Sequence, residues 1–470
     1  MNVGKIKRRI IKKCMLCCSL TFLMIIIVAN MNHSFNQRFM YDINGTLEMV
    51  RTGDVNTVSF KELSRLKKSE DFYKITGYSE IISMVSNRFV NSADNIKVVL
   101  TNKDYIEIYK RKLLAGRFLD EEAAKRNEAY AVISDKLAVE LFKTIDVIGN
   151  EIQTLGKEYT VSGVYKSDGS ILWDMCSDGF DRIFISYGSD GDYLEKPVDV
   201  LAVCVKPVQN SVEISFKLEK ALGSKIYSYR MIEHSITATV YQQYFDLMLF
   251  VIGSTAIVLT LIFLFRCFTN AIRLLRKKAD SYYFSALLKA EPRSFLLLLS
   301  VIFICSFCII LLIKCMQFEF VIADKFIPED NIFDIQFYMR AIQYSKMTSE
   351  LYTSNVYSVF EYIYKNALQL ELICILLAMS FFIGAIMFFN LLTELDMNFA
   401  SILRLILVTT LVGCIAGICI SMLLGLENIL HLNSWFVIAY FLMILFCRYT
   451  IIDHDSLLFF SKTTESQTEK

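Results

Sequence analysis

Four histidines and thirteen cysteines are the residues of this 470-residue chain that could most readily bind a metal ion or act as nucleophiles. His33, His234, His431 and His454 belong to no H-E-x-x-H pair, and the sequence holds no two C-x-x-C pairs and no G-x-S-x-G elbow. We expect Glu233 and His234 to be a surface pair just before a membrane span. The sequence therefore predicts no catalytic site, no metal site and no cofactor.

Two glycine-rich stretches resemble ligand-binding loops only in part. Gly149 to Lys157 is the nearest approach to a phosphate loop, but six residues separate its glycines and Glu158 follows the lysine, where a P-loop needs Ser or Thr. Ser189-Asp190-Gly191-Asp192 resembles part of a calcium loop but lacks the twelve-residue ligand pattern. We interpret it, together with Asp168-Gly169-Ser170 and Ser177-Asp178-Gly179, as turns.

The cysteines indicate packing rather than a disulfide framework. Eleven lie in or beside apolar segments, where cysteine acts as a small hydrophobic residue. Only Cys176 and Cys204 lie in a polar part of the chain, and the sequence does not decide whether they pair.

The composition is that of a membrane protein, because 54% of the residues are hydrophobic and only 21% are charged. Six apolar runs have about the length that a bilayer needs. They cover residues 14–30, 245–267, 295–317, 368–390, 402–424 and 434–450. The sequence predicts an α-helical membrane protein with about six spans and an α+β domain inserted between them.

Basic residues set the predicted topology. Lys5, Lys7, Arg8, Arg9, Lys12 and Lys13 precede the first span, which we interpret as an uncleaved signal anchor; a signal peptide is the alternative. A second basic stretch, 268–294, is then also cytoplasmic. The predicted divisions are a cytoplasmic N-terminus with the first span (1–31), an extracytoplasmic domain (32–243), spans two and three with the linker (244–317), an extracytoplasmic loop (318–367), spans four to six (368–452) and a cytoplasmic tail (453–470). The predicted topology is that of a multi-pass plasma-membrane protein in contact with lipids. No basic stripe lies outside the membrane flanks, so no nucleic-acid partner is expected.

Within the predicted outer domain, residues up to about 98 have helical patterning. Residues 105–116 suit a short helix that ends at Gly116, and residues 136–142 suit an amphipathic helix. Strands are predicted at 129–134, 182–187 and 198–205, a hairpin around Gly156-Lys157, and a helix at 211–222.

Two features of the spans bear on mechanism. No charged residue or histidine lies near the middle of a span, which disfavours an ion-coupled transporter. Gly413, Gly417, Ser421 and Gly425 recur every four residues and would let another helix approach closely. That helix could belong to the same chain or to a second copy in a dimer.

Three consecutive motifs carry a family resemblance. LLAGRFLDEE (113–122), AVISDKLAVELF (131–142) and VIGNEIQTLGKEYTVSGVYK (147–166) resemble the periplasmic core domain of MacB/FtsX-type ABC transporter permeases in order and spacing. The resemblance is dense over about 60 residues and extends more loosely to about residue 222. Phe118 directly after Arg117 departs slightly from the family pattern.

The resemblance implies a cytoplasmic ABC ATPase as partner and a permease dimer with a second copy or a paralogue. The basic linker 276–294 resembles the family segment that docks on the ATPase. The residues implied in docking are Arg276, Lys277, Lys278, Leu287, Leu288, Lys289 and Ala290. Asp280 and Glu291-Pro292 depart from the family pattern. The family has four or ten spans, so one predicted hairpin, 245–317 or 402–450, is extra.

These observations predict a non-catalytic permease subunit of a bacterial ABC transporter. ATP hydrolysis on a separate chain would move the outer domain, a mechanism called mechanotransmission, for export or extraction of a peptide, lipid or drug. The alternative is a regulatory or sensory membrane scaffold whose outer domain controls a partner such as a cell-wall hydrolase. The sequence does not identify a substrate.

Overall fold

The computed structural model describes residues 3–37, 45–68, 72–88, 91–120, 128–167, 170–204, 211–279, 292–317, 320–322, 327–328, 333–350, 356–393, 399–427 and 435–443. The chain divides into two compact units. We call Ser34–Tyr241 with Phe320–Leu370 the sheet unit, and Met1–His33 with Gln242–Glu319 and Glu371–Lys470 the helical unit.

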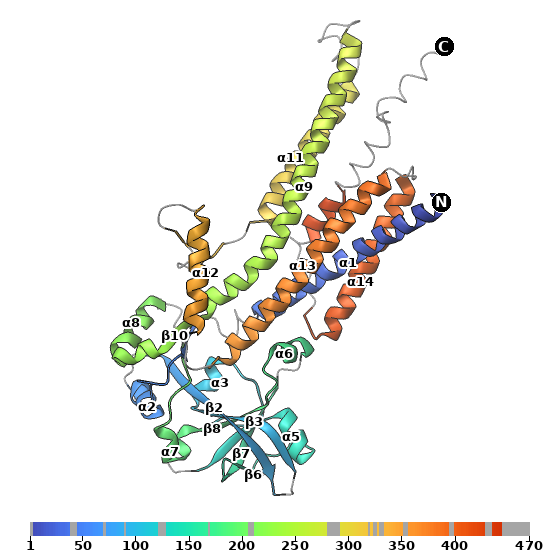
Figure 1. Cartoon of the computed structure of the whole chain (residues 1–470). Coiled ribbons are helices and arrows are strands. Elements are labelled where there is room, and N and C mark those ends of the chain that lie inside the picture. Colours follow the sequence, from blue (N-terminus) through green and yellow to red (C-terminus); the bar gives the residue numbers. More distant parts are fainter. Residues whose placement is uncertain are drawn as a thin grey trace. The chain divides into compact units, whose positions relative to one another are not determined.

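The sheet unit is built on ten strands (Figure 1). They are β1 (Thr46–Arg51), β2 (Lys74–Asn87), β3 (Ser92–Thr101), β4 (Leu113–Gly116), β5 (Tyr130–Ser134), β6 (Glu151–Thr154), β7 (Lys157–Tyr165), β8 (Arg182–Ser186), β9 (Val200–Cys204) and β10 (Tyr229–Glu233). Their order is β10-β1-β9-β2-β3-β8-β5-β7-β4, and β6 pairs with both β2 and β7. Only β3–β8 and β5–β7 pair in parallel, so the sheet is mixed.

Alternation along the strands gives the sheet two different faces, because neighbouring side chains of a strand point to opposite sides. Ile183 and Ile185 of β8 join a large aliphatic core, whereas Phe184 between them stacks among tyrosines. The core also takes in residues of α2 (Phe60–Lys68), α5 (Asp135–Phe142), α7 (Gly191–Leu194) and α8 (Ser211–Leu222). The other face, which we call the aromatic face, carries Tyr78, Tyr105, Tyr109, Phe118, Tyr165 and Phe184.

Several predicted elements of the sheet unit are confirmed. β5, α5, the β6–β7 hairpin, β8, β9 and α8 lie where the sequence predicts them. Ser134 starts α5 by accepting a hydrogen bond from the Leu137 amide, as an N-cap does. Lys143 ends the helix in the left-handed conformation.

Two helical predictions are wrong. Residues up to 98 form mainly β1, β2 and β3, because pairing in the sheet overrides a weak local helical preference. The predicted helix 105–116 ends early: α3 covers only Asp104–Ile108, and Leu113 and Leu114 belong to β4, which pairs with β7. Besides α3, this unit contains α6 (Ile171–Cys176) and α12 (Ile335–Glu350).

Long apolar helices make up the helical unit. They are α1 (Val3–Gln37), α9 (His234–Ala279), α11 (Pro292–Cys315), α13 (Val359–Thr393) and α14 (Phe399–Leu423); α1, α9 and α13 each have one end in the sheet unit. Among the described residues, all five are long and apolar enough to cross a membrane. Residues 435–443 of the predicted last span are helical, and 444–450 lie outside the described residues.

Candidate functional site

A buried carboxylate on the aromatic face joins three helices to the sheet. Glu48 lies on β1 between Leu47 and Met49, which point into the aliphatic core, so its side chain points to the opposite face. It is completely buried, as are His234, the first residue of α9, and Ser358, which precedes α13. We call Glu48, Tyr109, His234, Ser358 and Phe360 the junction.

The Glu48 carboxylate has a polar neighbour on each of the surrounding elements. The Tyr109 hydroxyl, one residue after α3, donates to Glu48 Oε1 at 2.5 Å, and His234 Nε2 lies 2.9 Å from Glu48 Oε2. The Ser358 side chain also lies beside the carboxylate and favours its charged form. A buried charge persists only when paired and hydrogen-bonded in this way.

The electrostatics follow from these contacts. Burial disfavours the charged form of Glu48, but the charge and hydrogen bond of His234, with those of Ser358 and Tyr109, outweigh burial and lower the pKa of the carboxyl. Burial and the nearby Glu48 charge raise the pKa of the Tyr109 hydroxyl well above its usual range, so this tyrosine stays a donor. The junction is therefore built to hold a carboxylate, not to transfer protons.

The sequence around Ser358 explains how α13 begins. Ser358-Val359-Phe360-Glu361 is an N-cap signature, and Ser358 Oγ accepts a hydrogen bond from the Glu361 amide at 3.0 Å. The Val359 amide donates to the hydroxyl of Tyr78 on β2 at 3.3 Å. Phe360 stacks on Tyr109 with ring centroids 5.5 Å apart and contacts the His234 ring at 6.3 Å.

A second ion-pair cluster lies on the same face of the sheet. Arg182 of β8 donates to Glu80 of β2 and to Asp178, and Lys97 of β3 lies 2.6 Å from each of these two carboxylates. The Arg182 side chain is 9% exposed. Burial raises the pKa of the Asp178 carboxyl, but Arg182 and Lys97 outweigh it, so the pKa is lowered. This cluster fastens three strands together.

The structure corrects the expected surface position of His234. Its side chain is 1% exposed and faces Glu48, whereas Glu233 is partly buried and accepts a hydrogen bond from Ser235 Oγ at 2.8 Å. Sequence reasoning also missed Glu48 and Ser358. The only signals were an acid inside the otherwise apolar strand TLEMVR and a capping motif before an apolar run.

The residues implied in ATPase docking are placed only in part. Arg276, Lys277 and Lys278 lie in the last turn of α9. Leu287, Leu288, Lys289 and Ala290 lie outside the described residues. Their docking role stays a prediction.

The small residues of α14 lie within the helical unit. A Cβ on Gly413 would stand 2.5 Å from the Ser19 carbonyl oxygen of α1, and a Cβ on Gly417 would stand 3.0 Å from Ile26 Cβ. Ser421 is buried, and Gly425 follows the helix with a positive φ. The first two glycines thus face a helix of the same chain, and a role for this stripe in a dimer stays open.

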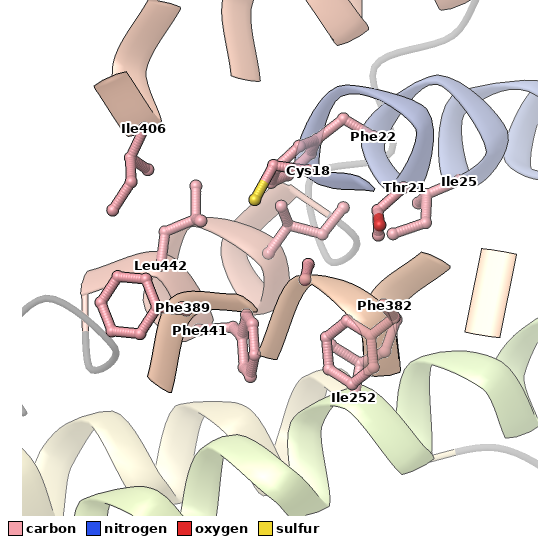
Figure 2. Close-up of a pocket in the computed structure, with 12 residues that line it drawn as sticks. Cys18, Thr21, Phe22, Ile25, Ile252, Phe382, Phe389, Ile406, Phe441 and Leu442 are labelled. Carbon is pink, nitrogen blue, oxygen red and sulfur yellow. The ribbon is translucent and has the colours of Figure 1, made fainter. Parts of the chain in front are cut away.

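An apolar cavity lies inside the helical unit (Figure 2). Its lining comes from α1, α9, α13, α14 and the helix 435–443, and none of the lining residues is charged. They are Cys18, Thr21, Phe22, Ile25, Ile252, Phe382, Ala385, Phe389, Ile406, Ile438, Phe441 and Leu442. Such a lining suits apolar groups and offers no site for an ion.

Two sequence features outside these sites have defined positions. Asp190 accepts a hydrogen bond from the Asp192 amide at the start of α7 and pairs with Lys157. The thiols of Cys176 and Cys204 are not joined in a disulfide. Residues 168 and 169 of the first predicted turn lie outside the described residues.

Comparison with known families finds one domain model that matches most of the strands of the sheet unit. Residues 15–221 match the model of the MacB-like periplasmic core domain. This match confirms the resemblance to MacB-type ABC transporter permeases seen in the sequence. A mixed α/β domain that resembles the MacB periplasmic region, together with several long apolar helices, fits a membrane protein.

Solved structures of the same kind share low sequence identity with this chain. The periplasmic region of MacB from Actinobacillus actinomycetemcomitans is 12% identical, with a TM-score of 0.36, over 42% of this chain and 92% of that chain. The extracellular domain of the noncanonic ABC-type transporter YknZ from Gram-positive bacteria is 13% identical, with a TM-score of 0.31, over 40% of this chain and 99% of that chain. A search of curated proteins finds no match.

Proposed function

We propose that this chain is the permease subunit of a MacB/FtsX-type ABC transporter, in which a separate cytoplasmic ATPase drives movement of the outer domain. The match of residues 15–221 to the MacB-like periplasmic core domain carries the proposal. No P-loop occurs within these 470 residues, so the energy would come from a partner.

The proposed mechanism is mechanotransmission. α9 is one uninterrupted helix of 46 residues that starts at the junction and ends in the basic turn Arg276–Lys278. A continuous helix transmits displacement along its axis, because its backbone hydrogen bonds hold its length nearly constant. ATPase closure at one end would then displace the junction at the other.

Co-purification of the ATPase tests this proposal. We expect the full chain to retain an ABC ATPase in mild detergent, and the triple variant Arg276→Glu, Lys277→Glu and Lys278→Glu to lose it, because three reversed charges would repel the docking surface. The tail variant Lys462→Glu with Lys470→Glu is the control and should keep the ATPase. Protease protection of the outer domain in spheroplasts checks that membrane insertion is unchanged.

Two outcomes would contradict the proposal. If no ATPase accompanies the wild-type chain and a cell-wall hydrolase does, the chain is a regulatory scaffold. If the triple variant keeps its ATPase, the docking surface lies elsewhere, and Glu394–Arg404 is the next segment to reverse.

A further inference from the structure

The start of α13 is part of the sheet unit rather than of a separate loop. Residues 320–370 group with 34–241, which places the first three turns of α13 in that unit. Phe360 packs against Tyr109, Trp173 and His234, and Asn366 Nδ2 donates to the Cys176 carbonyl of α6 at 3.0 Å. The helix then continues without a break to Thr393.

An ion pair ties α13 to the edge strand of the sheet. Arg230 of β10 donates to Glu361 Oε2 at 2.5 Å and to the Val356 carbonyl at 3.0 Å. Its guanidinium also lies over the Tyr357 ring, 5.3 Å from the centroid. Both charged side chains are about one-fifth exposed, so water screens this pair only weakly.

Glu48 links the attachment of α13 to the attachment of α9. Its carboxylate lies beside Ser358, the N-cap of α13, and 2.9 Å from the Nε2 of His234, the first residue of α9. The acceptor itself lies on β1, not on either helix. The two helix starts are therefore held to one buried charge in the sheet, and neither can shift without breaking a contact to it.

The C-terminal end of α1 reaches the same place. Phe35 stacks on Trp173 at 5.8 Å and contacts the Tyr241 ring of α9 at 5.9 Å; Tyr241 in turn lies 6.1 Å from Tyr364 of α13. Three apolar helices, α1, α9 and α13, thus meet through one aromatic cluster.

We propose that α13 is a third coupling helix beside α1 and α9, and that Glu48 is the positioning residue that makes α9 and α13 move together with the sheet. This inference rests on the proposed coupling function. It adds that a helix far from the outer domain in sequence transmits force to it, through Arg230–Glu361 and through Ser358.

Charge exchange at Arg230 and Glu361 tests the attachment of α13. The full chain in lipid nanodiscs is compared by hydrogen exchange with Arg230→Glu, Glu361→Arg and the double variant. We expect each single variant to raise the exchange rate at 359–370 about tenfold, and the double variant to bring it within about threefold of wild type. Glu195→Gln, which removes an exposed ion pair with Lys61, should change nothing. If the double variant exchanges as fast as the single variants, the ion pair does not attach α13 to β10.

Substitution of Glu48 tests the link between the helices. Glu48→Gln keeps the side-chain shape and removes the charge. We expect faster amide hydrogen exchange at both 234–241 and 359–370, and an unchanged exchange rate in strand β5. If this variant does not fold, Glu48→Asp, which keeps the charge but draws the carboxylate away from both helix starts, provides the same comparison. Faster exchange at only one of the two helix starts would overturn the role of Glu48.

A nucleotide-dependent measurement separates coupling from stability. In the complex with its ATPase, a non-hydrolysable ATP analogue should change exchange at both 234–241 and 359–370. In Glu48→Gln the change at 359–370 should be lost, with the ATP hydrolysis rate unchanged. A wild-type change confined to 234–241 would overturn the third coupling helix and leave the proposed function intact. If no ATPase binds, the proposed function fails. The Arg230 and Glu361 variants then still show whether the ion pair attaches α13 to β10.

Discussion

At the scale of single residues, buried charges hold the aromatic face of the sheet. Burial would destabilise the charged forms of the Glu48 and Asp178 carboxylates if they lacked polar and charged neighbours. Arg182 is shared between Glu80 and Asp178, and His234 faces Glu48. Because each partner compensates the burial of the other, removing one member leaves an uncompensated charge.

Asp178→Asn is expected to lower the stability of the sheet unit by about 3 kcal/mol, or roughly 6–12 °C in Tm for a domain of about 200 residues. The substitution leaves Arg182 and Lys97 with one carboxylate between them. The sequence has two tryptophans, so in a Trp435→Phe background the fluorescence of Trp173 follows this unit alone. Glu195→Gln is the exposed control and should shift Tm little. Equal shifts in both variants would contradict a buried network.

The same carboxylates predict an acid-labile domain. Because the pKa values of Glu48 and Asp178 are lowered in the folded chain, the unfolded chain binds more protons at low pH. Their contribution is complete above about pH 5 and is lost as pH falls through the lowered folded values. Trp173 fluorescence melts between pH 7 and pH 3 should show Tm falling only at the acid end, less steeply in Asp178→Asn. A Tm that rises on acidification would contradict the lowered pKa values of these two carboxyls.

At the scale of elements, two close approaches depend on glycine. Gly116 of β4 pairs with Gly163 of β7, and a Cβ on Gly163 would stand 2.4 Å from the Arg117 carbonyl oxygen. Backbone atoms on both sides cannot move aside as a flexible side chain would. These glycines therefore fix where β4 joins the sheet edge.

Gly163→Ala is expected to cost about 1–3 kcal/mol through overpacking against this backbone. Gly191→Ala is the matched control, because a Cβ there would meet no atom within 4 Å. Thermal unfolding followed by Trp173 fluorescence compares the two variants. A neutral Gly163→Ala would show that β4 can shift away from β7.

The approach of α14 to α1 gives a second prediction at this scale. Gly413→Val would place its side chain against the Ser19 carbonyl oxygen and Phe22, so we expect the yield of folded monomer to fall severalfold. Leu411→Val, on an exposed part of α14, is the control. Fluorescence-detected size exclusion measures the folded fraction. A normal monomer with a lost dimer would instead assign Gly413 to a dimer contact.

At the scale of the whole molecule, three helices from distant parts of the sequence are attached to the sheet unit: α9 and α13 start beside the buried Glu48 carboxylate, and α1 ends in the aromatic cluster of Phe35, Trp173, Tyr241 and Tyr364. α1 and α9 flank the MacB-like domain in sequence, so their attachment to it follows from connectivity. α13 follows α9 by about 80 residues and is attached only through side chains of the folded structure. Glu48→Gln should therefore affect α9 and α13 together, as the exchange experiment measures.

The sequence by itself determined the resemblance to MacB-type permeases, several strands and helices of the sheet unit, and the apolar helices. These rest on local patterns: motif order from Leu113 to Lys166, two-residue alternation, and runs of about 20 apolar residues. It wrongly predicted helix for strands β1, β2 and β3 and for residues 113–114, because strand pairing depends on partners far along the chain.

Only the tertiary structure decided what surrounds Glu48. Tyr109, His234 and Ser358 lie 61, 186 and 310 positions away from it in the sequence. No local periodicity relates residues so far apart, and an acid in a short strand usually faces solvent. Its burial against His234 and the start of α13 follows from the order of strands in the sheet, which brings β1 beside β10 and places both next to α9.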